Sequence, residues 1–141
     1  MSIAVLDAGI AIGWIQGRHR SFAKLNRLLR LVRSGHVEAV ISVVNLAEVL
    51  PHTAELSRAP GVDPVASLTA SGVRIHHPDE AVARRVAKLP TSLADGFAAA
   101  TAQELRGRLH TTDAELIRQL RSVRLPSRPT EGYPPASGDS K

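Results

Sequence analysis

The chain of 141 residues contains no cysteine, and aromatic residues make up only 3% of it. The absence of cysteine excludes disulfides and thiolate metal sites, so any metal must be bound through oxygen or imidazole ligands. The scarcity of aromatic residues argues against an RNA-binding platform on which bases stack. No apolar stretch reaches the roughly 18 residues of a membrane helix, and the N-terminus has no basic segment typical of a signal peptide. We therefore expect one domain, in the cytoplasm, with no membrane association.

Lysine is also scarce, because 15 of the 18 basic residues are arginine. The net charge is +5 and the isoelectric point is about 10.7. Arginine is suited to bidentate contacts with phosphate, so a nucleic acid or an acidic protein is a suitable partner. An arginine-rich coding bias would produce the same composition, and both explanations remain open.

Short β-rich runs alternate with longer runs of helical periodicity. We predict strands at residues 3–6, 39–42, 73–76 and 108–111, with a possible fifth at 123–125. Helices are expected at residues 8–16, 21–33, 64–70, 79–89, 92–106 and 113–120, with another after the second strand that Pro51 interrupts. This alternation predicts an α/β fold with a parallel sheet covered on both faces. The domain should span residues 1–125, and the Pro, Ser and Gly content of residues 126–141 predicts a disordered tail.

Four carboxylates stand beside apolar runs, where an unpaired charge is expensive to bury. Asp7 ends the first strand, Glu48 follows the second, Asp95 begins a small-residue helix and Asp113 follows the fourth strand. Parallel sheets place their sites at the carboxyl ends of the strands, so these acids are expected to converge. Carboxylate and water ligands suit Mg²⁺ or Mn²⁺, and the pattern therefore predicts one divalent-cation site.

Each acid also has an ordinary structural explanation. Asp7 and Asp113 each precede a predicted helix and would serve as N-caps. Asp95 would interact favourably with the dipole of its helix from the first turn. Glu48 would be an exposed helix acid. It is the joint pattern of the four that favours a site.

The four acids lie in segments that resemble the PIN domain, and more narrowly the VapC-type toxin ribonucleases. These segments are Val5-Leu6-Asp7-Ala8, Asn45-Leu46-Ala47-Glu48-Val49-Leu50, Ser92-Leu93-Ala94-Asp95 and Thr111-Thr112-Asp113. The resemblance implies a three-layer α/β/α fold with a central parallel sheet of four to five strands. It also implies a Mg²⁺- or Mn²⁺-dependent endoribonuclease that leaves a 3′-hydroxyl and a 5′-phosphate.

The resemblance extends to the site and the partners. It implies that Asp7, Glu48, Asp95 and Asp113 are the catalytic and metal-binding acids of the toxin of a type II toxin–antitoxin system. It further implies a small antitoxin and a homodimer. The chain departs from the family at Gly9, where many relatives have a hydroxyl or amide residue, and this removes a side chain that would contact Asp7 or metal-bound water.

Two other functions compete with this interpretation. A haloacid-dehalogenase-like phosphatase needs a second Asp two residues after the first, and Gly9 occupies that place. A non-catalytic PIN-like module that binds RNA or protein is the stronger alternative, although retention of all four acids argues against it.

The helix predicted at residues 21–33 offers an apolar stripe flanked by arginines. We hypothesise that this helix, together with Trp14 and Ile15, forms a groove for an amphipathic antitoxin helix. The alternative is that the stripe belongs to the core. Arg20, Lys24 and Arg27 share the opposite face, which is either a solvated surface or an RNA contact.

Overall fold

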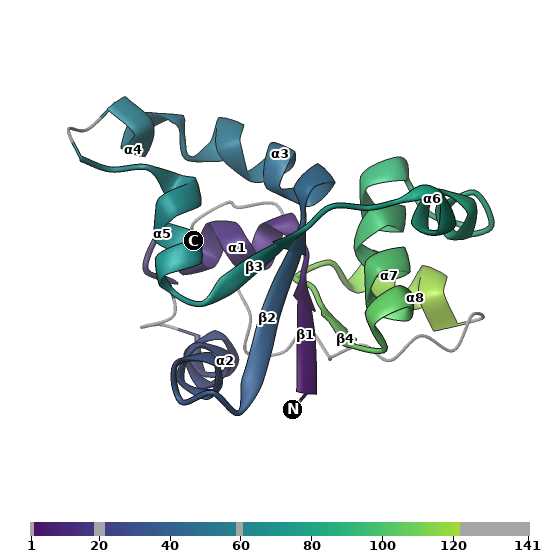
Figure 1. The fold of residues 1–141 in the computed structure, drawn as a ribbon, viewed down its shortest axis with the longest axis horizontal. Coiled ribbons are helices and arrows are strands. Elements are labelled where there is room, and N and C mark those ends of the chain that lie inside the picture. The colour runs from purple at the N-terminus through teal and green to yellow at the C-terminus, as the bar shows by residue number, and fades with distance from the viewer. Residues whose placement is uncertain (1, 19–21, 59–60, 122–141) are drawn as a thin grey trace.

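A four-stranded parallel sheet forms the centre of the molecule, in the computed structural model that describes residues 2–18, 22–58 and 61–121 (Figure 1). Its strands are β1 (Ser2–Leu6), β2 (Val37–Ser42), β3 (Val73–His76) and β4 (Arg108–His110), in the spatial order β3-β2-β1-β4. All three strand pairs are parallel. The predicted α/β class and parallel sheet are confirmed.

Helices cover both faces of the sheet, as the alternating pattern predicted. They are α1 (Ala8–Ile15), α2 (Ala23–Arg33), α3 (Val43–His52), α4 (Ala54–Arg58), α5 (Pro64–Ala70), α6 (Glu80–Val86), α7 (Leu93–Leu105) and α8 (Ala114–Leu120). In Figure 1, α1, α2 and α5 lie on one side of the sheet, and α6, α7 and α8 lie on the other. The arrangement is the expected three-layer α/β/α fold.

The core is divided by the sheet, because successive side chains of a strand point to opposite faces. On β1, Ala4 and Leu6 belong to the cluster under α1, α2 and α5, whereas Val5 belongs to the cluster under α7 and α8. The second cluster is built largely from Ala98, Ala99 and Ala102 of α7. These small side chains let α7 approach the sheet closely, which brings its first turn to the strand ends.

The apolar stripe of α2 is part of the core. Leu25, Leu28, Leu29 and Val32 are buried together with Trp14 against the sheet. The apolar stripe is therefore not itself a groove for a partner helix, and the alternative that it belongs to the core is confirmed. Arg20 lies outside the described residues.

Most predicted boundaries agree with the structure to within a few residues, and the differences have local causes. Helix α3 continues through Pro51 to His52, and the separate short helix α4 then begins, which was not predicted. Asp79 and Asp113 precede their helices as caps and are not part of them. The possible strand at residues 123–125 and the predicted tail lie outside the described residues. Among the described residues, no helix has both the length and the apolar character to cross a membrane.

The order of the sheet creates a position for a site. The chain moves from β1 to β2 to β3 in one direction, and β4 then pairs on the other side of β1. The carboxyl ends of β1 and β4 therefore lie where the strand order reverses, and open α/β sheets bind ligands at such points. Asp7 directly follows β1, and Asp113 comes three residues after β4.

Candidate active site

Asp7 connects the end of β1 to helix α1. Its backbone N–H donates to the carbonyl of His110 at the end of β4, at 3.0 Å. Its carboxylate Oδ1 accepts the N–H of Ile10, at 3.0 Å, and thereby caps α1. The cap explanation of this residue is thus confirmed. Only 7% of Asp7 is exposed, and capping a helix does not require such burial, so the cap alone does not explain where this side chain lies.

The loop after β4 supplies further donors to the same carboxylate. The hydroxyl of Thr111 donates to Oδ2 of Asp7 and accepts the backbone N–H of Asp113, the second bond at 3.0 Å. The backbone N–H of Thr112 also donates to Asp7. Of the two threonines, it is therefore Thr111 whose side chain points to the acid.

Burial raises the pKa of Asp7 from 3.8 to about 6, because a desolvated carboxylate favours its neutral form. The hydrogen bonds from Thr111, Ile10 and Thr112 oppose this rise, and the negative charge of Asp95 adds to it. The charge of Asp95 therefore acts on Asp7, although the two residues are far apart in the sequence.

Asp95 lies in the first turn of α7, which Ser92 caps. The pKa of Asp95 is raised by burial, lowered by a side-chain hydrogen bond from Ser92, and raised again by the charge of Asp113. The position in the first turn agrees with the dipole explanation. In addition, the charge of Asp113 acts on Asp95 and that of Asp95 acts on Asp7, so the three aspartates interact electrostatically along one edge of the sheet.

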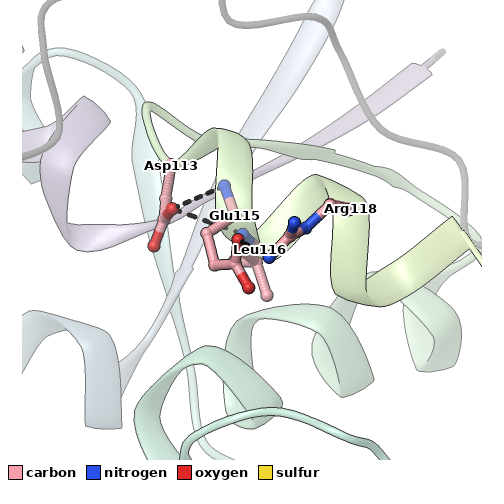
Figure 2. A network of polar contacts seen from close by, with 4 residues as sticks. All are labelled: Asp113, Glu115, Leu116 and Arg118. Carbon is pink, nitrogen blue, oxygen red and sulfur yellow. Dashed lines mark hydrogen bonds and ion pairs between the residues drawn. The ribbon is translucent and has the colours of Figure 1, made fainter.

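Asp113 caps α8 from the same edge. Its Oδ1 accepts the N–H groups of Glu115, at 2.9 Å, and Leu116, at 3.3 Å (Figure 2). Its second carboxylate oxygen takes no part in the contacts drawn in Figure 2. An ion pair between Glu115 and Arg118 lies along the same helix. The cap is again confirmed, and it uses only one of the two carboxylate oxygens.

Glu48 is placed differently from the three aspartates. It is exposed on α3, and its Oε1 accepts a hydrogen bond from Nδ2 of Asn45, at 3.1 Å. The same Nδ2 donates to the carbonyl of Ala94, at 3.0 Å, in the residue just before Asp95. Sequence reasoning did not single out Asn45. Its spacing of three residues from Glu48 on one helix was the available signal.

The four acids do not form a ready-made coordination site. Within residues 2–18, 22–58 and 61–121, no three His, Cys, Asp or Glu side chains are grouped closely enough to hold a metal ion. Asp7, Asp95 and Asp113 interact through their charges, and Glu48 reaches the first turn of α7 through Asn45. The arrangement is an acidic edge whose charges raise the pKa values of two of its members.

Gly9 has a packing explanation. A Cβ added at Gly9 would lie 2.3 Å from Oγ1 of Thr112, far inside van der Waals contact. The side chain of Thr112 therefore occupies the space that a side chain at residue 9 would need. A hydroxyl is thus present at this position after all, but it comes from the loop after β4.

The fold and this acidic edge agree with the comparison to known families. A model of the PIN domain matches residues 4–121. The chain belongs to the PIN domain family. The match contains all four acids and every described helix and strand except the beginning of β1. The predicted family is confirmed.

Solved structures with a similar fold include a toxin–antitoxin complex and two VapBC proteins. One is a toxin–antitoxin complex from Klebsiella pneumoniae, with 21% identity, a TM-score of 0.61, and coverage of 79% of this chain and 88% of that chain. Another is VapBC2 from Rickettsia felis bound to a DNA fragment from its promoter, with 18% identity, a TM-score of 0.62, and coverage of 89% and 97%. VapBC-1 from nontypeable Haemophilus influenzae has 19% identity, a TM-score of 0.60, and coverage of 89% and 96%. Among proteins of curated function, none matches the chain.

Proposed function

We propose that this PIN domain is a metal-dependent endoribonuclease of the VapC type, the toxin of a type II toxin–antitoxin pair. The observation that carries the proposal is the electrostatic interaction of Asp95 with Asp7 and with Asp113 at the reversal of strand order. The charge of Asp95 raises the pKa of Asp7, and the charge of Asp113 raises that of Asp95, so the like charges oppose one another in the metal-free protein. A bound cation would remove this repulsion, which is the usual reason for such a group.

The donor chemistry fits Mg²⁺ or Mn²⁺. The acidic edge offers carboxylates and hydroxyls and no thiol, and Mg²⁺ keeps several of its waters, so one or two direct carboxylate bonds suffice. We assign Asp7, Asp95 and Asp113 as the main ligands, and Glu48 as a further ligand or as the group that orients the attacking water. When bound, the cation would activate that water and stabilise charge on the phosphate.

The residues of the chain have separate parts in the proposed cleavage. Thr111 holds the carboxylate of Asp7 in one orientation, and the N–H groups of Ile10 and Thr112 favour its charged form. Attack of water on phosphorus and departure of the 3′-oxygen would leave a 3′-hydroxyl and a 5′-phosphate.

The charge of the surface supports an RNA substrate. A pocket of about 530 Å³ between α6 and α7 is lined by Ala81, Arg84, Arg85, Lys88, Leu89 and Gln103. Arg84 and Arg85 are paired with Glu80 and Glu104, at 2.9 and 3.1 Å, and Lys88 adds a third positive charge. These basic side chains, of which Arg84 and Arg85 are each paired with a carboxylate, would contact a phosphate of the substrate backbone.

The partner of the proposed toxin would be a small antitoxin, and the toxin would be a homodimer. Support for the antitoxin comes from the structural neighbours, which include a toxin–antitoxin complex and two VapBC proteins. Expression of the chain alone should arrest growth of a bacterial host, and co-expression of the small reading frame next to its gene should relieve the arrest. Arrest by the Asp7→Asn variant would contradict a toxin that acts by RNA cleavage.

The alternative function is a non-catalytic PIN-like module that binds RNA or protein. Asp7→Asn and Asp95→Asn should each abolish Mg²⁺-dependent RNA cleavage while the protein stays folded. Asp79→Asn is the matched control, because Asp79 also caps a helix, α6, by accepting the N–H of Val82 at 3.1 Å. Cleavage by the wild-type protein that is absent without metal would exclude the alternative. Equal cleavage by Asp7→Asn and wild type would show that the site is assigned wrongly.

A further inference from the structure

Asn45 joins two helices beside the acidic edge. It lies on α3 and is only 1% exposed. Its Nδ2 group donates to Oε1 of Glu48, one turn later on α3, and to the carbonyl of Ala94 in the first turn of α7. One amide group therefore connects the exposed acid on α3 to the turn that carries Asp95.

The orientation of this amide is determined by its neighbours. Both groups that Nδ2 contacts, the Glu48 carboxylate and the Ala94 carbonyl, are acceptors only. Exchanging the oxygen and nitrogen would place Oδ1 against two acceptors, which is unfavourable. The carbonyl oxygen Oδ1 must then point elsewhere, and it is buried without a hydrogen-bond partner in the described part of the chain.

The stability of the fold does not account for an asparagine at this position. A buried acceptor without a donor is destabilising, and an apolar side chain of similar volume avoids that cost. Glu48 is exposed and does not need the bond for its own solvation. The Ala94 carbonyl lies inside helix α7, where helical hydrogen bonding is available to it. A role in holding Glu48 beside α7 explains why a donor is kept at this position.

We propose that Asn45 is a positioning residue of the active site. Its Nδ2 holds the Glu48 carboxylate toward the first turn of α7. Groups that orient metal ligands in this way affect affinity and activity without touching the reacting atoms. This inference rests on the proposed nuclease function, because it requires Glu48 to act in the same site as Asp95.

The test is a double-mutant cycle with Asn45→Leu and Glu48→Ala. Leu has a similar volume and offers neither donor nor acceptor. Asn26→Leu is the control, because Asn26 is the other asparagine of the chain and lies on another helix, α2. Three quantities are measured for each protein: Mn²⁺ affinity by calorimetry, kcat and KM for RNA cleavage, and the thermal unfolding midpoint.

Asn45→Leu should weaken Mn²⁺ binding and lower kcat by about 10- to 100-fold, the range for residues that orient ligands. KM for RNA and the unfolding midpoint should change little, and Asn26→Leu should match wild type in all three measurements. Because Asn45 acts through Glu48, the double variant should have the same Mn²⁺ affinity and kcat as the more impaired of the two single variants. A merely structural role would lower the midpoint, and its loss of activity would add to that of Glu48→Ala.

The outcomes separate this inference from the proposed function. If the wild type cleaves RNA with Mg²⁺ and Asn45→Leu equals it in Mn²⁺ affinity and kcat, the role of Asn45 is refuted and the nuclease function stands. Additive losses with a lowered midpoint would also refute it. If the wild type does not cleave RNA, the nuclease function is refuted. The Mn²⁺ affinities of the single and double variants then decide whether Asn45 acts on the site through Glu48.

Discussion

The hydroxyl of Thr111 donates to Oδ2 of Asp7 across 104 residues of sequence. The same hydroxyl accepts the backbone N–H of Asp113, so one side chain links two acids of the edge. Because the bond stabilises the charged form of a buried carboxylate, it keeps the pKa of Asp7 lower than burial alone would. Thr111 thereby controls both the orientation and the charge of Asp7.

Replacing Thr111 with valine tests this relationship. Valine keeps the branched shape and removes the hydroxyl, so the pKa of Asp7 should rise above about 6. The free energy of unfolding near neutral pH should fall by about 1.5–3 kcal/mol, the range for a hydrogen bond to a charged group. Titration of the Asp7 carboxyl by NMR and urea unfolding would measure the two effects. Thr69→Val is the control, because the hydroxyl of Thr69 bonds only to carbonyls of its own helix α5. An unchanged Asp7 titration would contradict the assignment.

The raised pKa of Asp7 predicts that the metal-free protein becomes less stable as pH rises. The folded state holds the Asp7 proton up to about pH 6, whereas the unfolded chain releases it near pH 3.8. Above pH 3.8 the free energy of unfolding therefore falls as pH rises. The full decrease of roughly 3 kcal/mol is reached above pH 6. The measurement is urea unfolding in EDTA from pH 4 to pH 7. Other acids titrate in this range, so the quantity to compare is the difference between wild type and Asp7→Asn, which keeps a capping side chain. A difference that does not vary with pH would refute the prediction.

Gly9→Ala should destabilise the protein, because the added Cβ would lie 2.3 Å from Oγ1 of Thr112. Overpacking of this kind costs about 1–3 kcal/mol in unfolding free energy. Adding Thr112→Ala should recover most of the stability, since it removes the atoms that the new methyl group meets. Chemical unfolding of both single variants and the double variant measures the coupling. Strictly additive effects would mean that the two side chains do not compete for the same space.

Lys88→Glu should weaken binding of single-stranded RNA by removing a positive charge that neutralises a phosphate in the pocket between α6 and α7. The slope of log affinity against log salt should decrease in magnitude by about 0.7 for each phosphate that is no longer neutralised. Fluorescence anisotropy in the Asp7→Asn background avoids cleavage during the measurement. Arg33→Glu, on the exposed end of α2, changes the net charge equally and is the control. If both variants weaken binding equally, the effect is due to net charge and the pocket is not a specific binding site.

The sequence by itself determined the local structure and the family. Short β-rich runs located every described strand, because both faces of the sheet are buried, and helical periodicity located most helices, because each buries one face. The four acids were located because each stands next to such an element. The short helix α4 was missed because nothing in its five residues has a periodic pattern.

Only the tertiary structure decided which aspartates belong together. Asp7, Asp63, Asp79 and Asp113 each cap a helix through the same local hydrogen bonds, so capping does not distinguish them. Asp7 differs because β4 pairs beside β1 and brings the loop after β4 against it. The burial that raises its pKa, the charge of Asp95 and the crowding at Gly9 all depend on contacts between distant segments. Local sequence patterns contain no information on these contacts, because burial and electrostatic coupling arise only when the chain is folded.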